Sequence, residues 1–553
     1  MHDAEARQGT GAEAVAFTWR HAALVFGVAL IPRLAHWWFV RHTPLASEFV
    51  PDLSAYLFAV DRLMHSAYFF VEPMLMSPGY ALVLAPQYIL VGPDVPVFVL
   101  VNAVLDAASA ALCAGLAAGL AARLAPSGRE RVLAVRTGLL AGLLYALCGP
   151  LLFYDLLPLG EGPTVFCLLA GLTLLFAAPR RGAPAAWLSG ALFALAALIR
   201  PNLAPGVLLA LAVWSLFPGA GRRARLAVAT RCALGLLIAL TPFMAHNAKV
   251  AGRVSPFGFQ GGFTLYTGNH PGASGVGDAL PGFGNTPYVV ILQAWRQAEE
   301  HTGHELSLAG ADAYWYGRTW RFFAGHPGEA ARLMARKALL LLNAHGLDAT
   351  ANQDFCARFS PVPGWLDLPV GLVFALAAVG LWAACRRRAG QMGEDDAGRC
   401  PPEAAALLAL LLGVSLLVVL FQVTPRYRVV LLPLAFPFAA LALAELLSSI
   451  PPSMPLFRRG GWRAHAAPLS LSVLLLATSF IPLRLLVDKP GLAALEHARL
   501  ARYYLLAGPQ SLARVEFAEA LRLSAPDQTE FRAGLKSGLA ASLLLGNQDA
   551  PRP

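Results

Sequence analysis

Long apolar runs recur along almost the whole chain, and they constrain its fold more than any other feature. A helix needs about 20 apolar residues to cross roughly 30 Å of hydrocarbon, and about eleven runs reach that length. Helices are expected because a spanning segment must satisfy its own backbone hydrogen bonds, and the runs are too evenly apolar for barrel strands. The sequence therefore predicts an all-α polytopic membrane protein with about 11 transmembrane helices, in a range of about 10 to 13.

Composition agrees with a membrane location. Of 553 residues, 57% are hydrophobic and 14% are charged, so too little polar surface remains for a soluble globular protein. The predicted spans run approximately over residues 18–40, 95–123, 133–152, 157–178, 185–200, 203–218, 229–246, 365–385, 403–423, 429–447 and 466–486.

The net charge of +10 reports topology, and we expect no nucleic acid partner. Runs of arginine lie in short loops between alternate spans, which by the positive-inside trend face the cytoplasm. The predicted parts are a cytoplasmic tail (1–17), a membrane domain (18–486) with external loops at 41–94 and 247–364, and an extracytoplasmic tail (487–553). The predicted location is the inner (plasma) membrane of a bacterium.

The external segments contain further helical patterns. Apolar residues spaced for one helix face follow Asp52, and a short apolar run over 81–90 is expected in the membrane interface rather than across it. Two more helices are expected near 307–324 and 327–344. In the last segment, the string from Ala513 to Pro526 is similar to half of a tetratricopeptide repeat. It indicates either a small helical cap or a surface for a protein partner.

Two acids are candidates for chemistry at the outer face. Asp52 follows the first span and could serve an external active site, although an acid before an amphipathic helix is also a common N-cap. Glu161 lies at the outer mouth of the fourth span. An acid at that depth is costly unless it is paired or hydrated, so Glu161 is expected either to line a polar cavity or to pair with a cation such as Arg200.

Four cations map to the outer side, against the positive-inside trend: Arg200, Lys337, Arg426 and Arg428. Together they indicate an anion site, because a departing phosphate gains negative charge that fixed cations stabilise. The alternative for each is contact with lipid headgroups. No metal-ligand spacing is found among the histidines, so no metal or other cofactor is predicted.

Several motifs occur in an order that resembles one enzyme family. They are Asp52-x-x-x-Tyr56, Ser77-Pro78-Gly79-Tyr80, Leu157-Pro158-Leu159-Gly160-Glu161, Leu198-Ile199-Arg200-Pro201, His246-Asn247 followed by Gly261-Gly262-Phe263-Thr264-Leu265-Tyr266-Thr267-Gly268-Asn269-His270-Pro271, Lys337 through Asn343, Asn352-Gln353-Asp354-Phe355, and Arg426-Tyr427-Arg428. The chain resembles bacterial GT-C glycosyltransferases related to the protein O-mannosyltransferases and the aminoarabinose lipid A transferases. The resemblance covers roughly residues 18–485.

The resemblance implies a reaction and a set of roles. Sugar would pass from a polyprenyl-phosphate carrier to an extracytoplasmic acceptor, with inversion, and Asp52 would be the general base. Glu161 would orient the first loop or the acceptor. Arg200, Lys337, Arg426 and Arg428 would bind the donor phosphate, and the acceptor or loop candidates are Tyr56, Asn247, Tyr266 and Asn269.

The sequence departs from the family at two places. Ala344-His345-Gly346-Leu347 stands where a Glu is expected, and His246 replaces an Arg. The sugar and the acceptor, which could be protein, glycolipid or cell-envelope glycan, are therefore left open. A lipid-linked saccharide transporter or flippase, or a lipid-binding membrane protein without catalysis, is the competing class. A third interpretation is a scaffold that recruits partners through its last helices.

Overall fold

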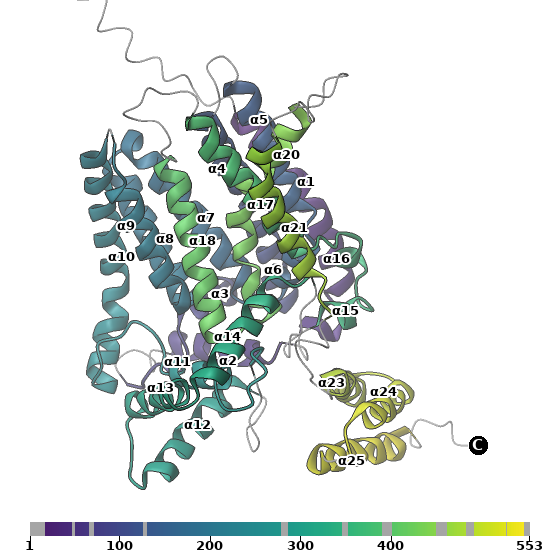
Figure 1. Ribbon diagram of the computed structural model, residues 1–553. Helices are drawn as coiled ribbons and strands as arrows, with labels where there is room; N and C mark the ends of the chain where they lie inside the picture. Colours follow the sequence, from purple (N-terminus) through teal and green to yellow (C-terminus); the bar gives the residue numbers. More distant parts are fainter. Residues whose placement is uncertain are drawn as a thin grey trace, which may run out of the picture.

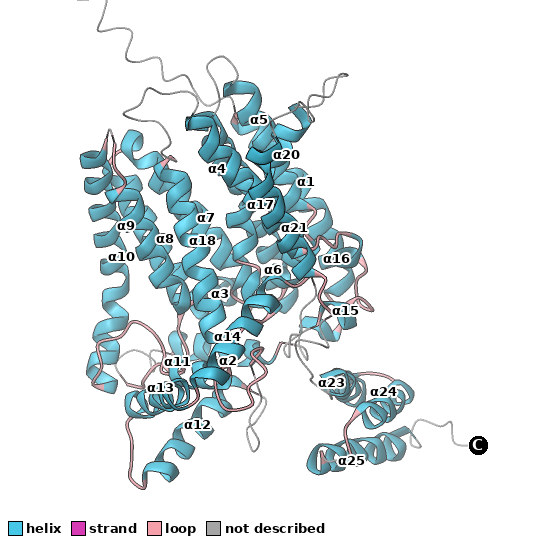
Figure 2. Cartoon of the chain, viewed as in Figure 1, coloured by secondary structure: helices cyan, strands magenta, loops and turns pink. Residues whose placement is uncertain are grey.

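The computed structural model describes residues 17–46, 50–65, 71–124, 130–219, 221–277, 286–344, 352–389, 401–448, 462–482, 492–526 and 528–546. Within these ranges all regular structure is helical, with no strand (Figures 1 and 2). The all-α prediction is confirmed for the described residues. Some segments used in the sequence predictions lie outside these ranges, namely His345 to Leu347, the arginines at 458 and 459, and most of 1–17.

Five helices are long and apolar enough to cross a membrane. They are α1 (Trp19–Val40), α4 (Val95–Leu124), α7 (Glu161–Arg181), α10 (Arg222–Ala251) and α18 (Pro402–Phe421). A sixth span is possible if the bent pair α5 (Glu130–Ala146) and α6 (Gly149–Leu156) counts as one. The described residues therefore hold five or six such helices, fewer than the eleven or so that the apolar runs predict.

The other predicted spans coincide with shorter apolar stretches. These belong to α8 (Ala183–Ile199), α9 (Ala204–Leu216), α17 (Val370–Ala389), α20 (Leu431–Ser448) and α21 (Trp462–Ser479). Figure 1 shows these helices running alongside the longer ones in one bundle. Because a helix rises 1.5 Å per residue, the 17 residues of α8 cover about 26 Å, slightly less than the hydrocarbon thickness.

The run over 133–152 was predicted to be one uninterrupted span, and this prediction was wrong. The chain bends by 59° between α5 and α6. Gly149 begins α6, and its backbone N–H donates to the carbonyl of Leu366 at 2.7 Å. A Cβ at Gly149 would collide with the carbonyl oxygen of Pro363, so this approach requires glycine. The adjacent Gly149 and Pro150 are the local signal for the break.

Arginines lie at the helix ends that meet at one end of the bundle. Arg180 and Arg181 end α7, Arg222 begins α10, and Arg123 lies in the last turn of α4. These ends lie at the top of Figure 1. The opposite end carries the short helices of the two loops predicted to be external.

That opposite end carries a set of short helices. They are η1 (Pro44–Ala46), α2 (Pro51–Met64), α3 (Gly79–Val91), η2 (Pro201–Leu203), α11 (Gly261–Thr267), α12 (Pro287–Thr302), α13 (Leu308–Gly325), α14 (Pro327–Leu342), α15 (Gln353–Cys356), α16 (Val362–Trp365) and α19 (Pro425–Arg428). Of these, α2, α3, α13 and α14 fall on the segments predicted to be helical. Leu53 and Val60 of α2 are buried, as its pattern predicts. The 13-residue α3 covers the run that was predicted to be too short to span.

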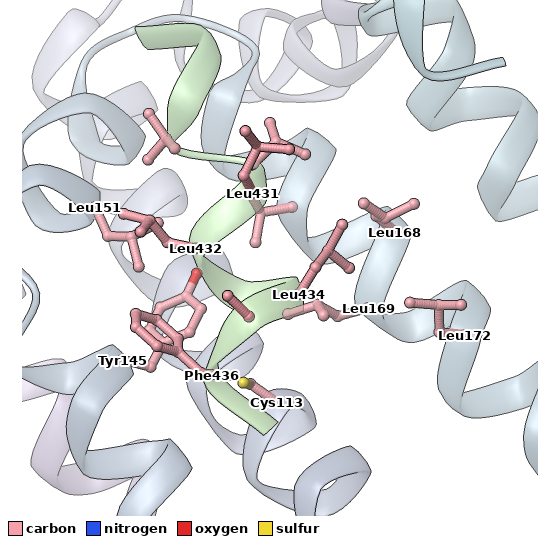
Figure 3. Packing of buried hydrophobic residues seen from close by; sticks show 14 of the residues in the cluster. Cys113, Tyr145, Leu151, Leu168, Leu169, Leu172, Leu431, Leu432, Leu434 and Phe436 are labelled. Carbon is pink, nitrogen blue, oxygen red and sulfur yellow. The ribbon is translucent and has the colours of Figure 1, made fainter. Parts of the chain in front are cut away.

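The core of the bundle is built around α20, which packs mainly against α17, α5 and α4. Figure 3 shows Leu432 and Phe436 of this helix among Leu151, Tyr145 and Cys113. The ring centroids of Tyr145 and Phe436 are 6.0 Å apart, in an edge-to-face arrangement. Since lipid is as apolar as these side chains, close packing rather than exclusion from lipid holds the helices together.

The last three helices form a small unit with its own core. They are α23 (Leu492–Ala507), α24 (Gln510–Leu523) and α25 (Thr529–Gly546). Ala513, Phe517 and Ala520, from the repeat-like string, are buried in it. Arg358 Nη1 lies 3.1 Å from Glu516 Oε1 and ties this unit to the bundle. The C-terminal segment is helical as predicted, and its use as a cap or as a partner surface stays a prediction.

Candidate functional site

Four elements bring predicted site residues together at the end of the bundle opposite the arginine runs. Asp52 lies in the first turn of α2, behind Pro51, and Glu161 is the first residue of α7. Acids are favourable at such helix N-termini because of the helix dipole. Arg200 follows α8 and precedes Pro201, whose ring disfavours helical backbone in the residue before it. Arg426 lies in α19, which Pro425 begins.

The alternative that Asp52 caps a helix is wrong for this structure. The N-cap of α2 is Val50, and Asp52 is a residue of the helix itself. Its carboxylate turns to another element, because Arg426 Nη1 donates to Asp52 Oδ2 at 2.7 Å.

Arg426 bridges the two predicted acids. Besides its bond to Asp52, its Nε lies 3.2 Å from Glu161 Oε1. Arg200 forms an ion pair with the same Glu161 oxygen. Two guanidinium groups and two carboxylates from four elements thus form one charged cluster, in which Glu161 is the shared partner of both arginines.

The four side chains of the charged cluster differ in their exposure to solvent. Glu161 is fully buried, whereas the side chains of Asp52, Arg426 and Arg200 are 15%, 13% and 17% exposed. Glu161 Oε1 is within ion-pair distance of both arginines, but the angles are not those of hydrogen bonds, and Oε2 has no hydrogen-bond partner among the described residues. Burying a carboxylate without hydrogen bonds costs free energy. The Glu161 oxygens can therefore still accept hydrogen bonds.

Tyrosine rings surround the charged cluster. Arg200 and Arg426 lie over the ring of Tyr427, with 4.9 and 5.5 Å from guanidinium carbon to ring centroid, which is cation–π geometry. Burial by itself would raise the pKa of Tyr427, yet the two adjacent arginines hold it below its ordinary value. Gln422 Nε2 donates to the Tyr427 hydroxyl at 3.3 Å. The tyrosine is therefore held in place by the loop that carries Arg426.

A second pair of rings joins two of the sequence motifs. Tyr56 of α2 meets Tyr80 of α3 edge to face, with 4.9 Å between ring centroids. Burial raises the pKa of Tyr56 to about 12, so its hydroxyl is neutral near pH 7. Gly79 allows α3 to approach the end of α8, because a Cβ there would collide with the backbone of Leu198 and Ile199. The motifs around Asp52, Gly79 and Arg200 are thus neighbours in space.

Lys337 and Asn269 belong to a separate, fully buried cluster. Lys337 Nζ donates to Asn269 Oδ1 at 2.7 Å and to the carbonyls of Phe421 at 2.8 Å and Leu420 at 3.3 Å. Asn269 Nδ2 also donates to the Leu420 carbonyl, at 2.8 Å. These carbonyls are at the C-terminal end of α18, where backbone acceptors lack intrahelical partners. Both side chains therefore fix the helix end from which the Arg426 loop departs.

Arg428 has a similar place at another helix end. It is buried, and its Nη1 donates to the carbonyls of Leu340 at 3.1 Å and Asn343 at 2.5 Å, at the C-terminus of α14. Arg426 and Arg428, only two residues apart, thus serve different neighbours. Arg426 enters the charged cluster, whereas Arg428 binds the end of α14.

The remaining acceptor or loop candidates are outside the charged cluster. Asn247 is buried, and its Nδ2 donates to the carbonyls of Ser255 at 2.8 Å and Phe257 at 3.0 Å, which holds the segment that follows α10. Tyr266 packs on Trp315 with 4.9 Å between centroids, and its hydroxyl accepts from Arg318 at 3.3 Å. Both positions organise the external helices.

One buried charged group was not predicted from the sequence. Arg33 Nε lies 2.7 Å from Asp106 Oδ2, and both side chains are fully buried between α1 and α4. Arg33 also donates to the carbonyls of Tyr145 at 3.3 Å and Ala146 at 2.9 Å, where α5 breaks. Asp155 is buried in α6, and neither of its oxygens has a hydrogen-bond partner among the described residues. Charges inside apolar runs were the available signal for this group.

No protein-family model matches this chain, and no curated protein matches it either. Among the described residues no three His, Cys, Asp or Glu side chains gather as metal ligands, and the prediction of no cofactor stays untested. The composition and the apolar helices indicate a helical membrane protein. Its distinctive feature is a cluster of paired arginines and carboxylates at one end of the bundle.

Proposed function

We propose that the chain is a membrane glycosyltransferase that transfers sugar from a polyprenyl-phosphate carrier to an acceptor outside the cytoplasm. The observation that carries the proposal is the position of Arg426, which contacts Asp52 and Glu161 beside Arg200. Paired arginines suit a phosphate because their planar donors match its oxygens. A carboxylate next to them suits the removal of a proton from an acceptor.

In the proposed reaction the acceptor oxygen or nitrogen attacks the anomeric carbon from the face opposite the phosphate. The bond between that carbon and the phosphate oxygen breaks, and the electron pair leaves with the polyprenyl phosphate. The acceptor proton passes to Asp52. One displacement of this kind inverts the anomeric configuration.

In this proposal Arg426 couples binding of the donor to the freedom of Asp52 to accept a proton. The Asp52 carboxylate is occupied by Arg426, whose Nη1 lies 2.7 Å from Oδ2. A donor phosphate competes for the same guanidinium group. Binding of the donor therefore loosens the hold of Arg426 on Asp52, whereas Glu161 keeps Arg200 nearby. In this scheme the Asp52 carboxylate is released for the acceptor only when the sugar donor is bound.

Lys337 and Arg428 act as positioning residues in the proposal. Their donors bind the ends of α18 and α14, which flank the loop of Arg426. Their positive charges still contribute to the local potential, since charge acts over a longer distance than a hydrogen bond. Asn269 acts together with Lys337.

The proposed orientation follows from the two ends of the bundle. The end with the arginine runs would face the cytoplasm together with the N-terminus, and the charged cluster and C-terminal helices would lie outside. The proposed setting is a bacterial inner membrane. A lipid-carried sugar could then reach the cluster from the outer leaflet.

A lipid-linked saccharide transporter is the second candidate, and one observation favours it. The bent pair α5 and α6 resembles the broken helices of transporters, and Asp106 and Asp155 are buried near the break. The cluster of Asp52 and Glu161 has no evident use in transport, so the transferase is preferred.

The test is release and transfer of sugar from a radiolabelled polyprenyl-phosphate hexose or pentose by the purified protein. We expect turnover with the natural chain and its loss in Asp52→Asn, with donor binding retained. Asp61→Asn, an exposed position on the same helix, is the matched control and should behave like the natural chain. Equal turnover in Asp52→Asn would remove Asp52 from catalysis. Donor movement across vesicles without sugar release would favour the transporter.

A further inference from the structure

A cavity of about 590 Å³ lies where the C-terminal helices approach the bundle. Its walls come from α23 and α25, with Phe517 of α24 between them, and Pro51 and Thr286 from the bundle side. Figure 1 shows the three helices beyond the end of the bundle. The cavity is of the size that holds a small ligand or a few residues of a chain.

The lining combines an apolar floor with three charged side chains, which are Arg499, Arg502 and Glu530. Phe517, Phe531 and Leu535 supply apolar surface, and Arg502 and Glu530 lie on different helices around it. Arg502 and Glu530 are exposed, and neither forms an ion pair within the described part of the chain. A ligand that fits this lining carries apolar groups and charges of both signs.

Gly534 of α25 lines an open part of the cavity wall. A Cβ built at Gly534 has no atom within 4 Å, although the residue lines the cavity in the middle of a helix. One turn further along, the space above Gly538 is occupied by the ring of Phe517. Glycine is a poor residue for a helix interior, costing roughly 1 kcal/mol relative to alanine. The space beside Gly534 is therefore open, and a large side chain placed there would project into the cavity.

We propose that this cavity binds an extended polypeptide segment in which an acidic and a basic residue flank apolar side chains. The acidic residue pairs with Arg502, the basic residue pairs with Glu530, and the apolar side chains pack on Phe517 and Phe531. A glycan would need many hydrogen-bonding side chains for its hydroxyls, and the lining offers few. A lipid chain would leave the charges unused and would have to leave the bilayer.

Binding here places the polypeptide next to the charged cluster. Pro51 lines the cavity, and Asp52 follows it in the chain. The binding does not depend on glycosyl transfer, and a peptide seated in the cavity is a partner whether or not it becomes the acceptor.

The experiment measures fluorescence anisotropy of short labelled peptides with the purified full-length protein in detergent. The pool carries one aspartate and one lysine flanking leucine and phenylalanine, and its comparison pool replaces both charges by serine. We expect binding of the first pool at least about tenfold tighter than that of the second. Gly534→Trp should lower this affinity at least about tenfold by filling the cavity. Gly317→Trp, at another open helical glycine, should leave it unchanged.

A charge exchange provides the second variant. Arg502→Glu should weaken the first pool and favour a pool in which lysine replaces its aspartate. Helix content and elution volume of each variant show whether it is folded. Failure of the natural chain to bind either pool overturns the proposal, and so does equal binding by Gly534→Trp. Peptide binding without sugar transfer supports this cavity while counting against the transferase, so the two proposals fail separately.

Discussion

Arg426 Nη1 lies 2.7 Å from Asp52 Oδ2, although 374 positions separate the two residues in the chain. Arg426 also reaches the buried Glu161, so one side chain from the loop after α18 joins α2 to α7. This contact closes the site from the side of the late helices. It is the most direct point at which to test the assignment of the site.

Arg426→Lys is expected to weaken binding of a polyprenyl-phosphate sugar at least about tenfold, because a single ammonium cannot bridge Asp52 and Glu161 in the manner of a guanidinium group. The measurement is donor binding by the purified protein, followed by turnover. Arg321→Lys is the control, since that exposed arginine bonds only within α13. Unchanged donor binding in Arg426→Lys would show that the phosphate lies elsewhere.

Lys337→Met is expected to destabilise the protein by about 1–3 kcal/mol, because Asn269 Oδ1 and the end of α18 would lose a buried charged donor. Thermal unfolding in detergent measures the change. Lys536→Met, on the exposed face of α25, should leave the midpoint unchanged. A stable Lys337→Met protein that fails to bind donor would instead make Lys337 a direct phosphate ligand.

The C-terminal helices are expected to be less stable at higher pH because of Glu496. Burial raises the pKa of Glu496 from an ordinary 4.5 to about 8. The folded state therefore holds this proton more tightly than the unfolded state does. The contribution of Glu496 to stability is fully present below pH 4.5 and is lost as the pH rises through about 8.

Hydrogen exchange of α23 to α25 between pH 5 and 9 measures this effect, after correction for the intrinsic pH dependence of exchange. Glu496→Gln should remove most of the slope, since glutamine stays neutral throughout. Glu300→Gln, on α12, is the control for a carboxylate outside this unit. An unchanged slope in Glu496→Gln would assign the pH dependence to another group.

The sequence predicted the helical class and the principal charged residues for clear physical reasons. Apolar runs of spanning length leave few alternatives to helices, and charges at their ends stand out against the composition. Asp52, Glu161, Arg200 and Arg426 were each selected in this way, and they meet in one cluster. The pairing of Arg426 with Asp52 could not be derived, because no local pattern relates residues so far apart.

The sequence could not distinguish two uses of a cation. Lys337 and Arg428 were selected because they lie against the positive-inside trend, and that property suits an anion ligand. It also suits a cation that binds the carbonyl end of a helix, which is where both side chains lie. The bend at Gly149 was missed for a related reason, since apolar content does not report backbone direction.

Arg33→Met is expected to destabilise the bundle more than Asp106→Asn, although the two residues form one buried ion pair at 2.7 Å. Asp106→Asn leaves a buried arginine without its counter-charge, a loss of about 3–5 kcal/mol in comparable pairs. Arg33→Met leaves Asp106 without a cation and also removes the donors to Tyr145 and Ala146 at the end of α5. The carbonyl of Ala146 then loses its arginine donor in a dry environment, and the carbonyl of Tyr145 keeps the Cys148 N–H at 3.3 Å.

Thermal unfolding of both variants in the same detergent checks this order, with Asp61→Asn as a surface control. If Arg33 acts only as a counter-charge, the two variants should lose similar stability, and joint replacement of Arg33 and Asp106 by apolar residues should restore most of it. If Arg33 also holds the bend between α5 and α6, as its bonds to the backbone indicate, the joint replacement should restore only part. The bent pair is then maintained by a side chain of α1, which explains why an apolar run with the length of one span is divided into two helices.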